Sequence, residues 1–126
     1  LITEDVDFIS IDVSFISLEL VLPVAKDILG PKGEIVALVK PQFEAGKGKV
    51  GKGGIVRDKK VHIEVIEKII DLAGELGFNI KALTNSPIKG TSGNIEFLIY
   101  LSNYGEASET FDAKEIVNKA YENLND

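Results

Sequence analysis

The stretch Ile35-Val36-Ala37-Leu38-Val39-Lys40-Pro41-Gln42-Phe43-Glu44 decides the fold class of this chain. Five apolar residues without polar alternation are typical of a strand that is covered on both faces, as in the middle of a parallel sheet. The run stops at Lys40, and Pro41 then turns the chain. Because ligands of open α/β sheets bind beyond the carboxyl ends of the strands, Lys40 is a candidate substrate-facing residue. The alternative is a solvated lysine at a strand end.

The composition indicates a folded globular domain with one modest core and excludes several classes of protein. The chain has 126 residues, of which 44% are hydrophobic, and no apolar run approaches the roughly 20 residues of a membrane span. It contains no cysteine and one histidine, His62, so we expect neither a disulfide framework nor a metal site. The start lacks the basic region of a signal peptide. These features predict a cytoplasmic protein without membrane partners.

The beginning of the chain indicates a piece of a longer protein. There is no methionine, and the chain opens at Leu1 immediately before a strand-like run. We therefore expect an upstream part that completes the sheet. An exposed strand edge at this point predicts that the isolated piece self-associates.

Residues 46–60 form a basic segment in an acidic chain. The net charge of −6 argues against a general nucleic-acid binder. The segment contains six cationic residues and one carboxylate, so its net charge is +5, and the rest of the chain has a net charge of −11. The cationic residues are Lys47, Lys49, Lys52, Arg57, Lys59 and Lys60, and the carboxylate is Asp58. One loop is therefore a candidate for contact with phosphates.

The order of predicted elements is strand, helix, strand, helix, hairpin and helix. Strands are expected at 8–15, 35–39, 80–88 and 94–101, and helices at 18–29, 59–76 and 113–124. Ser17, Asp58 and Asp112 are the expected helix caps, and His62 is expected to be a partly exposed residue in the first turn of its helix. This order predicts a mostly parallel sheet that ends in an antiparallel hairpin, with flanking helices.

Three ionisable residues occupy comparable positions on the predicted strands. Asp12 and Lys40 lie at the ends of two strands, and Glu96 lies early in the last one. If that strand is antiparallel and joins the same sheet, all three converge at one edge. Carboxylates beside a lysine can orient it for proton transfer. A structural ion-pair cluster that secures the strand ends is the alternative.

Four blocks of the sequence resemble the TlyA (hemolysin A) family of ribosomal RNA 2′-O-methyltransferases, a branch of the FtsJ-like methyltransferases. The resemblance covers about Asp5 to Leu101. The blocks are Ile11-Asp12-Val13-Ser14-Phe15-Ile16-Ser17, Leu38-Val39-Lys40-Pro41-Gln42-Phe43-Glu44, Val50-Gly51-Lys52-Gly53-Gly54-Ile55-Val56-Arg57-Asp58 and Gly93-Asn94-Ile95-Glu96-Phe97-Leu98.

The resemblance implies a Rossmann-like domain that transfers a methyl group from S-adenosylmethionine to a ribose 2′-hydroxyl. Family members use a Lys-Asp-Lys-Glu tetrad, and Asp12, Lys40 and Glu96 match its last three members. Lys40 would be the base, and the segment Asp12-Val13-Ser14-Phe15 would also border the methyl donor. The first lysine, the glycine-rich cofactor loop and the amino-terminal RNA-binding domain have no counterpart here, so the isolated piece is expected to be inactive and to bind no cofactor.

The basic loop has three interpretations. Residues 46–52 match the first seven positions of a phosphate-binding G-x-x-x-x-G-K-[ST] motif, but Gly53 replaces the hydroxyl residue, and no helix follows directly. Nucleotide hydrolysis is therefore disfavoured. As an RNA-facing loop, it would present Lys47, Lys49, Lys52 and Arg57 to phosphates. A solvated flexible loop is the third interpretation.

The resulting hypothesis is the carboxyl-terminal half of an FtsJ-like methyltransferase domain over residues 1–103, followed by a helical extension over 104–126. Its expected partners are ribosomal RNA or ribosomal subunits. The rival hypothesis is a non-enzymatic RNA-binding module, in which Asp12, Lys40 and Glu96 are structural. The hemolysin name raises membrane lysis, but no segment of this sequence supports it.

Overall fold

The computed structural model describes residues 6–46, 48–51, 53–87, 89, 93–105 and 110–124. One sheet contains four strands, β1 (Val6–Ile11), β2 (Leu29–Val39), β3 (Asn79–Asn85) and β4 (Phe97–Ser102). The helices are α1 (Leu18–Ile28), α2 (Pro41–Glu44), α3 (Lys59–Glu75) and α4 (Ala113–Leu124). The predicted order of elements is confirmed, with α2 as an additional short helix.

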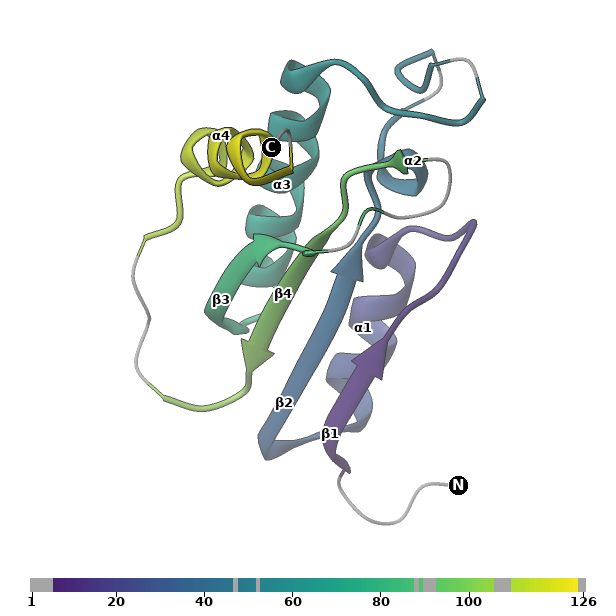
Figure 1. The fold of residues 1–126 in the computed structure, drawn as a ribbon. Coiled ribbons are helices and arrows are strands. Elements are labelled where there is room, and N and C mark those ends of the chain that lie inside the picture. The colour runs from purple at the N-terminus through teal and green to yellow at the C-terminus, as the bar shows by residue number, and fades with distance from the viewer. Residues whose placement is uncertain are drawn as a thin grey trace.

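The strand order of the sheet is β1-β2-β4-β3 (Figure 1). β1 and β2 are parallel, whereas β4 runs antiparallel to both of its neighbours, β2 and β3. The predicted antiparallel last pair is therefore confirmed, and the sheet of the described strands is mixed, with β1 and β2 as its parallel pair. The register pairs Val39 of β2 with Phe97 of β4, so the carboxyl end of β2 lies beside the amino end of β4.

The core lies between the sheet and the helices on one of its faces. α1 and α3 lie behind the strands in Figure 1, and α4 packs against α3 and β3. On β2, the side chains of Ile35, Ala37 and Val39 point into this layer and are fully buried. Among the helices of the described ranges, none is both long and apolar enough to cross a membrane.

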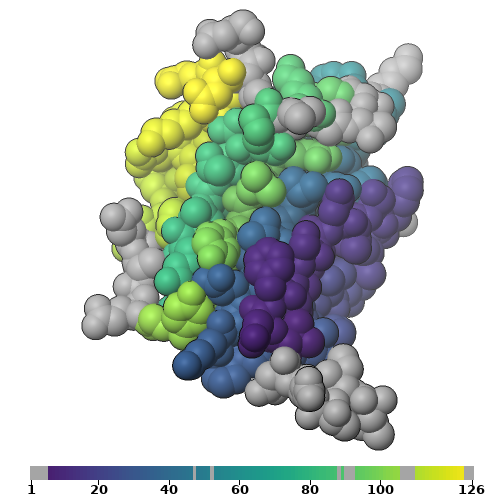
Figure 2. Space-filling model, turned by 60° about the horizontal axis from the view of Figure 1, so that its bottom comes forward, coloured from purple at the N-terminus to yellow at the C-terminus, as the bar shows by residue number. Residues whose placement is uncertain are grey.

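The opposite face of the sheet is only partly covered. Val36 and Leu38 alternate with the buried residues of β2 and are half-buried, and Phe8 on the same face of β1 is 55% exposed. Figure 2 shows atoms of β1, β2 and β4 at the surface. The expectation that β2 is covered on both faces is wrong for the described residues. The long helices α1 and α3 lie on the face toward which Ile35, Ala37 and Val39 point, and α4 packs at the β3 edge of the sheet. The apolar run at 35–39 nevertheless forms a central strand.

The helices begin at the capping residues that the sequence predicts. The Ser17 hydroxyl accepts a hydrogen bond from the Glu19 amide at 3.0 Å, and the Asp58 carboxylate accepts one from the Lys60 amide at 2.9 Å. Asp112 does the same for Lys114 at 3.0 Å. These contacts satisfy amides that have no partner within the helix.

His62 corrects one expectation about α3. Instead of being partly exposed, it is buried, with a relative exposure of 1%. Its Nδ1 lies 2.7 Å from the hydroxyl of Tyr121 on α4, and its ring also contacts Phe97. The physical reason is that α4, which is remote in the sequence, covers the first turns of α3.

Candidate active site

Lys40 lies at the carboxyl end of β2 and directly precedes α2. β2 is buried up to Val39, and Lys40 is the first residue beyond it. Pro41 is well suited to begin α2, because the first amides of a helix have no partner within it and proline has no amide hydrogen. The Lys40 Nζ lies 2.5 Å from Asp12 Oδ1 and 3.3 Å from the Ser14 hydroxyl. The lysine side chain is 13% exposed, whereas that of Asp12 is 62% exposed. The pair is therefore shielded on the lysine side and open on the carboxylate side.

The parallel pairing of β1 and β2 brings Asp12 to Lys40. Ile11 pairs with Ala37, so both strands deliver their next residues to the same edge of the sheet. The chain then turns at Phe15, which has a φ of +64° and a side chain that is 90% exposed. A left-handed conformation is costly for an aromatic residue, so this loop holds backbone strain beside the Lys40–Asp12 pair.

Glu96 reaches the same edge from the opposite direction. It immediately precedes Phe97, the β4 partner of Val39, so Glu96 and Lys40 are neighbours across two antiparallel strands. Glu96 is buried, and its Oε2 accepts a hydrogen bond from Gln42 Nε2 at 3.0 Å. The predicted convergence of Asp12, Lys40 and Glu96 is thus present. Lys40 contacts Asp12 directly, whereas the contact of Glu96 is with Gln42.

Two residues of α2 that the sequence analysis did not select contribute to this edge. Gln42 donates to Glu96, and its Oε1 is buried without a hydrogen-bond partner in the described part of the chain. Glu44 is buried and accepts hydrogen bonds from the Ser17 hydroxyl and the Leu18 amide at 2.6 and 2.8 Å. The sequence feature that could have identified them is the position of Gln42 and Glu44 one and three residues after Pro41.

The loop that follows β1 offers groups suited to a nucleoside-bearing cofactor. Asp12 supplies a carboxylate, Ser14 a hydroxyl and Phe15 an exposed ring, while Val13 is half-buried against the core. They lie beyond the carboxyl end of a parallel strand, where ligands of such sheets bind. These groups fit one wall of a cofactor site.

The basic segment between α2 and α3 is only partly described, and Lys47 and Lys52 lie outside the described residues. Lys49 forms an ion pair with Glu64 of α3 at 2.5 Å, and both side chains are about half exposed, at 49% and 55%. Lys49 and Arg57 line a surface hollow of about 410 Å³. The hollow is therefore of mixed charge: Lys60 adds a third cation, whereas Asp58 and Glu64 add two carboxylates, and Glu64 already partners Lys49.

The carboxyl-terminal part of this segment is fixed to Asn94, in the stretch that leads into β4. Asn94 is buried, its amide donates to the Gly54 carbonyl at 2.9 Å, and its Oδ1 accepts from the Val56 amide at 3.0 Å. Asn94 is two residues before Glu96. The loop and the candidate active site thus share one anchor.

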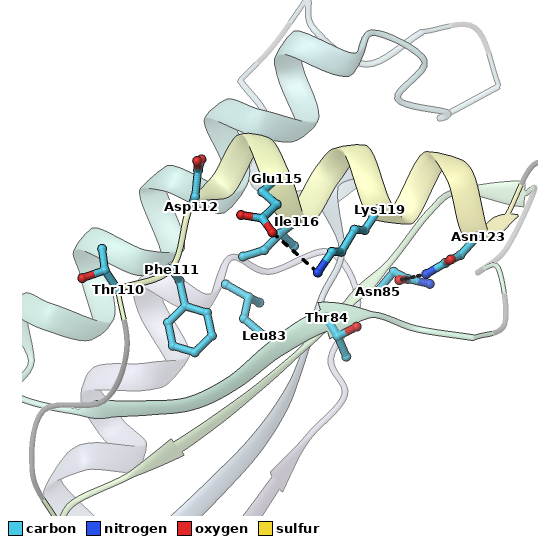
Figure 3. Close-up of a pocket in the computed structure, with 10 residues that line it drawn as sticks. All are labelled: Leu83, Thr84, Asn85, Thr110, Phe111, Asp112, Glu115, Ile116, Lys119 and Asn123. Carbon is cyan, nitrogen blue, oxygen red and sulfur yellow. Dashed lines mark hydrogen bonds and ion pairs between the residues drawn. The ribbon is translucent and has the colours of Figure 1, made fainter.

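A separate pocket of about 300 Å³ lies between β3, α4 and the segment that leads into α4. Figure 3 shows Asn85 of β3 meeting Asn123 of α4 at one end of it, and their amides are 3.2 Å apart. The pocket contains none of Asp12, Lys40 and Glu96. It is therefore distinct from the candidate active site.

The sheet edge described above agrees with a match to known proteins. Residues 1–103 match the family of FtsJ-like methyltransferases. The chain belongs to this family. Its fold is a mixed α/β sheet with flanking helices, as expected for an FtsJ-like methyltransferase.

Individual relatives of this FtsJ-like chain carry related names. It is 48% identical over 123 residues to YqxC of Bacillus subtilis (strain 168), which is provisionally named an rRNA methyltransferase. It is 43% identical over 96 residues to the 16S/23S rRNA (cytidine-2′-O)-methyltransferase TlyA of Mycobacterium tuberculosis (strain CDC 1551 / Oshkosh). These alignments cover 94% and 76% of this chain but 44% and 36% of the relatives. The chain thus spans less than half the length of these two proteins.

A solved structure shows the same arrangement of elements. A Streptococcus thermophilus protein, provisionally titled a hemolysin, superposes with a TM-score of 0.88 and 45% sequence identity. The superposition covers 98% of this FtsJ-like chain and 46% of the other. The resemblance to TlyA and hemolysin A proteins that the sequence motifs indicate is therefore confirmed.

Proposed function

We propose that this chain is the carboxyl-terminal half of the catalytic domain of an S-adenosylmethionine-dependent methyltransferase that modifies ribose 2′-hydroxyls of ribosomal RNA. The observation that carries the proposal is the Lys40–Asp12 pair at 2.5 Å, at the sheet edge where Glu96 immediately precedes β4. Family membership and the names of the relatives support it. In this proposal, residues 1–103 belong to the methyltransferase domain and residues 104–126 form a helical extension.

Lys40 is the proposed base. S-adenosylmethionine supplies an electrophilic methyl group when it is bound. The ribose 2′-oxygen becomes a better nucleophile as its proton passes to Lys40 Nζ, which must be unprotonated to receive it. The Asp12 carboxylate, which contacts Nζ, would accept a hydrogen bond from the neutral amine and would stabilise the ammonium that forms when the proton arrives. Gln42 holds Glu96 at the same sheet edge.

Positioning supplies much of the catalytic effect of such a site. A hydroxyl and an amine held in reacting geometry avoid the entropic cost of a bimolecular encounter. In the proposal, Asp12, Val13, Ser14 and Phe15 border the cofactor. Their loop lies at the carboxyl end of β1, adjacent to Lys40.

The basic loop is the proposed contact with ribosomal RNA or ribosomal subunits. Lys47, Lys49, Lys52 and Arg57 would bind phosphates and so position the ribose without reading the base sequence. The hollow beside Lys49 and Arg57 supports this role. Its attachment through Asn94 to the strand of Glu96 would couple RNA contact to the reaction site.

The test is methyl transfer from labelled S-adenosylmethionine to total ribosomal RNA by the full-length protein, meaning the longer protein proposed to contain this chain. Lys40→Ala and Glu96→Ala are expected to abolish labelling, and Lys119→Ala on the exposed surface of α4 is the matched control. Labelling by Lys40→Ala near the wild-type rate would contradict the role of Lys40. RNA binding without any labelling by the wild-type protein would instead favour a non-enzymatic RNA-binding module.

A further inference from the structure

Glu44 is a buried carboxylate outside the proposed catalytic group. Its side chain is only 2% exposed, although it follows Lys40 by four residues on a short surface helix. A buried carboxylate is costly unless hydrogen bonds or a cation stabilise it. Its partners therefore indicate what the burial serves.

Three donors from two other helices surround this carboxylate. Glu44 Oε1 accepts from the Ser17 hydroxyl at 2.6 Å, and Oε2 accepts from the Leu18 amide at 2.8 Å. Ser17 is the cap and Leu18 the first residue of α1, whose amino end favours negative charge. The third donor is Lys68 of α3, whose Nζ lies 3.3 Å from Oε1.

These contacts join the two segments that carry the Lys40–Asp12 pair. Glu44 ends α2, which begins immediately after Lys40. Ser17 ends the loop that begins at Asp12. The segments 12–17 and 40–44 are therefore connected at both ends, by the Asp12–Lys40 ion pair at one end and by the Ser17–Glu44 hydrogen bond at the other.

We propose that Glu44 is a positioning residue that sets the geometry of Lys40 relative to Asp12 by fastening α2 to the start of α1. This inference rests on the proposed methyl transfer, in which Lys40 receives the proton. Loosening the Glu44–Ser17 link lowers kcat and leaves KM for RNA unchanged. Misplacement of a reacting group by about 1 Å reduces the rate by on the order of a hundredfold.

The experiment compares two variants of the full-length protein, each of which removes one donor to Glu44 Oε1. Ser17→Ala removes the side-chain hydrogen bond to the start of α1 together with the cap on the Glu19 amide, while the Leu18 amide still donates to Glu44 Oε2. Lys68→Met removes the link to α3. We expect Ser17→Ala to reduce kcat by about ten- to a hundredfold at constant KM for RNA. Lys68→Met keeps kcat even though it lowers the melting temperature. Ser17→Thr retains a hydroxyl and restores kcat.

A second readout does not depend on methyl transfer. An amine-acylating reagent followed by mass spectrometry measures the reactivity of Lys40 in the folded protein, with the 68%-exposed Lys119 as internal standard. Ser17→Ala and Glu44→Gln are expected to raise Lys40 labelling about two- to fivefold, the range for the loss of one partly exposed ion pair.

Three outcomes separate this inference from the proposed function. Faster Lys40 labelling with kcat lowered in Ser17→Ala supports both. Faster Lys40 labelling in a protein without methyl transfer supports the positioning role of Glu44 and overturns the proposed function. Unchanged Lys40 labelling in both variants, or a kcat that falls equally in Lys68→Met and Ser17→Ala, overturns the positioning role of Glu44.

Discussion

The ammonium of Lys40 lies 2.5 Å from the carboxylate of Asp12, although 28 positions separate them in the chain. Parallel pairing of β1 and β2 accounts for this contact, because both strands end at one edge. The neighbouring antiparallel strand then adds Glu96 to the same place. Several consequences of this arrangement can be measured.

Asp12→Asn in the full-length protein tests whether the ion pair matters for catalysis. The amide keeps the shape of the side chain but removes the charge that orients Lys40. We expect kcat for RNA methylation to fall by roughly a hundredfold or more, within the usual range for acid–base groups. Steady-state kinetics with labelled cofactor measure the change. An Asp27→Asn variant on exposed α1 serves as control, and equal rates in both would contradict the prediction.

Gln42→Leu tests the support of Glu96. The leucine leaves a buried carboxylate without its amide donor at 3.0 Å. The loss of a partner for a buried charged group is expected to cost about 1–3 kcal/mol of unfolding free energy. Urea denaturation measures this, with Gln42→Glu as a second variant that places two carboxylates together and costs at least as much. A midpoint equal to that of wild type in both would show that Glu96 finds another partner.

His62 predicts a stability that decreases on the acid side of neutrality. Burial lowers the pKa of His62 below its ordinary 6.5, and the Asp58 carboxylate only partly opposes this effect. The unfolded chain therefore binds a proton more readily than the folded one, so stability is complete above about pH 6.5 and is lost as the pH falls toward the lowered value. In addition, the buried Nε2 has no hydrogen-bond partner in the described part of the chain, so a proton there would be left unpaired.

Thermal unfolding between pH 5 and pH 8 measures this dependence. His62→Gln is the matched control, because it retains a polar side chain near Tyr121 without titrating in this range. The difference in melting temperature between pH 8 and pH 5.5 should be smaller in the variant. An identical pH dependence in the two proteins would assign the effect to carboxylates instead.

RNA binding by the full-length protein should depend on salt through the basic loop. Replacing Lys49 and Arg57 with alanine removes two candidate partners of RNA phosphates. The slope of log K against log salt should become shallower by about 0.7–0.9 for each phosphate that the loop no longer neutralises. Filter binding at several salt concentrations measures this slope, with Lys114→Ala on α4 as control. A uniform decrease in affinity at an unchanged slope would exclude phosphate binding by these two residues.

The chain by itself is expected to self-associate through β1. This strand lies at the edge of the sheet, and Phe8 on its uncovered face is 55% exposed. Unpaired edges and exposed apolar side chains promote association. Analytical ultracentrifugation of residues 1–126 should show oligomers that Phe8→Lys reduces.

Calorimetry on the same sample should detect no S-adenosylmethionine binding, and saturable binding would relocate the proposed cofactor site.

Local patterns were sufficient to predict the family and the order of the main elements, but not α2 or all of the bounds. The strand expected at 8–15 ends at Ile11, the strand expected from residue 35 begins at Leu29, and the strand expected from residue 94 begins at Phe97. The apolar run at 35–39 and the caps Ser17 and Asp58 depend on interactions within a few residues. The motifs around Asp12, Lys40 and Glu96 preserve the resemblance because they are continuous in the chain. Such features can be recognised without knowledge of what lies next to them.

Only the tertiary structure decided which side chains meet. α4 buries His62 from 59 positions away, and the uncovered face of β2 follows from where the helices lie. In the sequence, Glu44 does not differ from other polar residues near a turn. Its role depends on the start of α1, where the Ser17 hydroxyl lies 2.6 Å from Glu44 Oε1. Burial and hydrogen-bond partners depend on contacts between segments distant in sequence, whereas propensity and capping depend on neighbours along the chain.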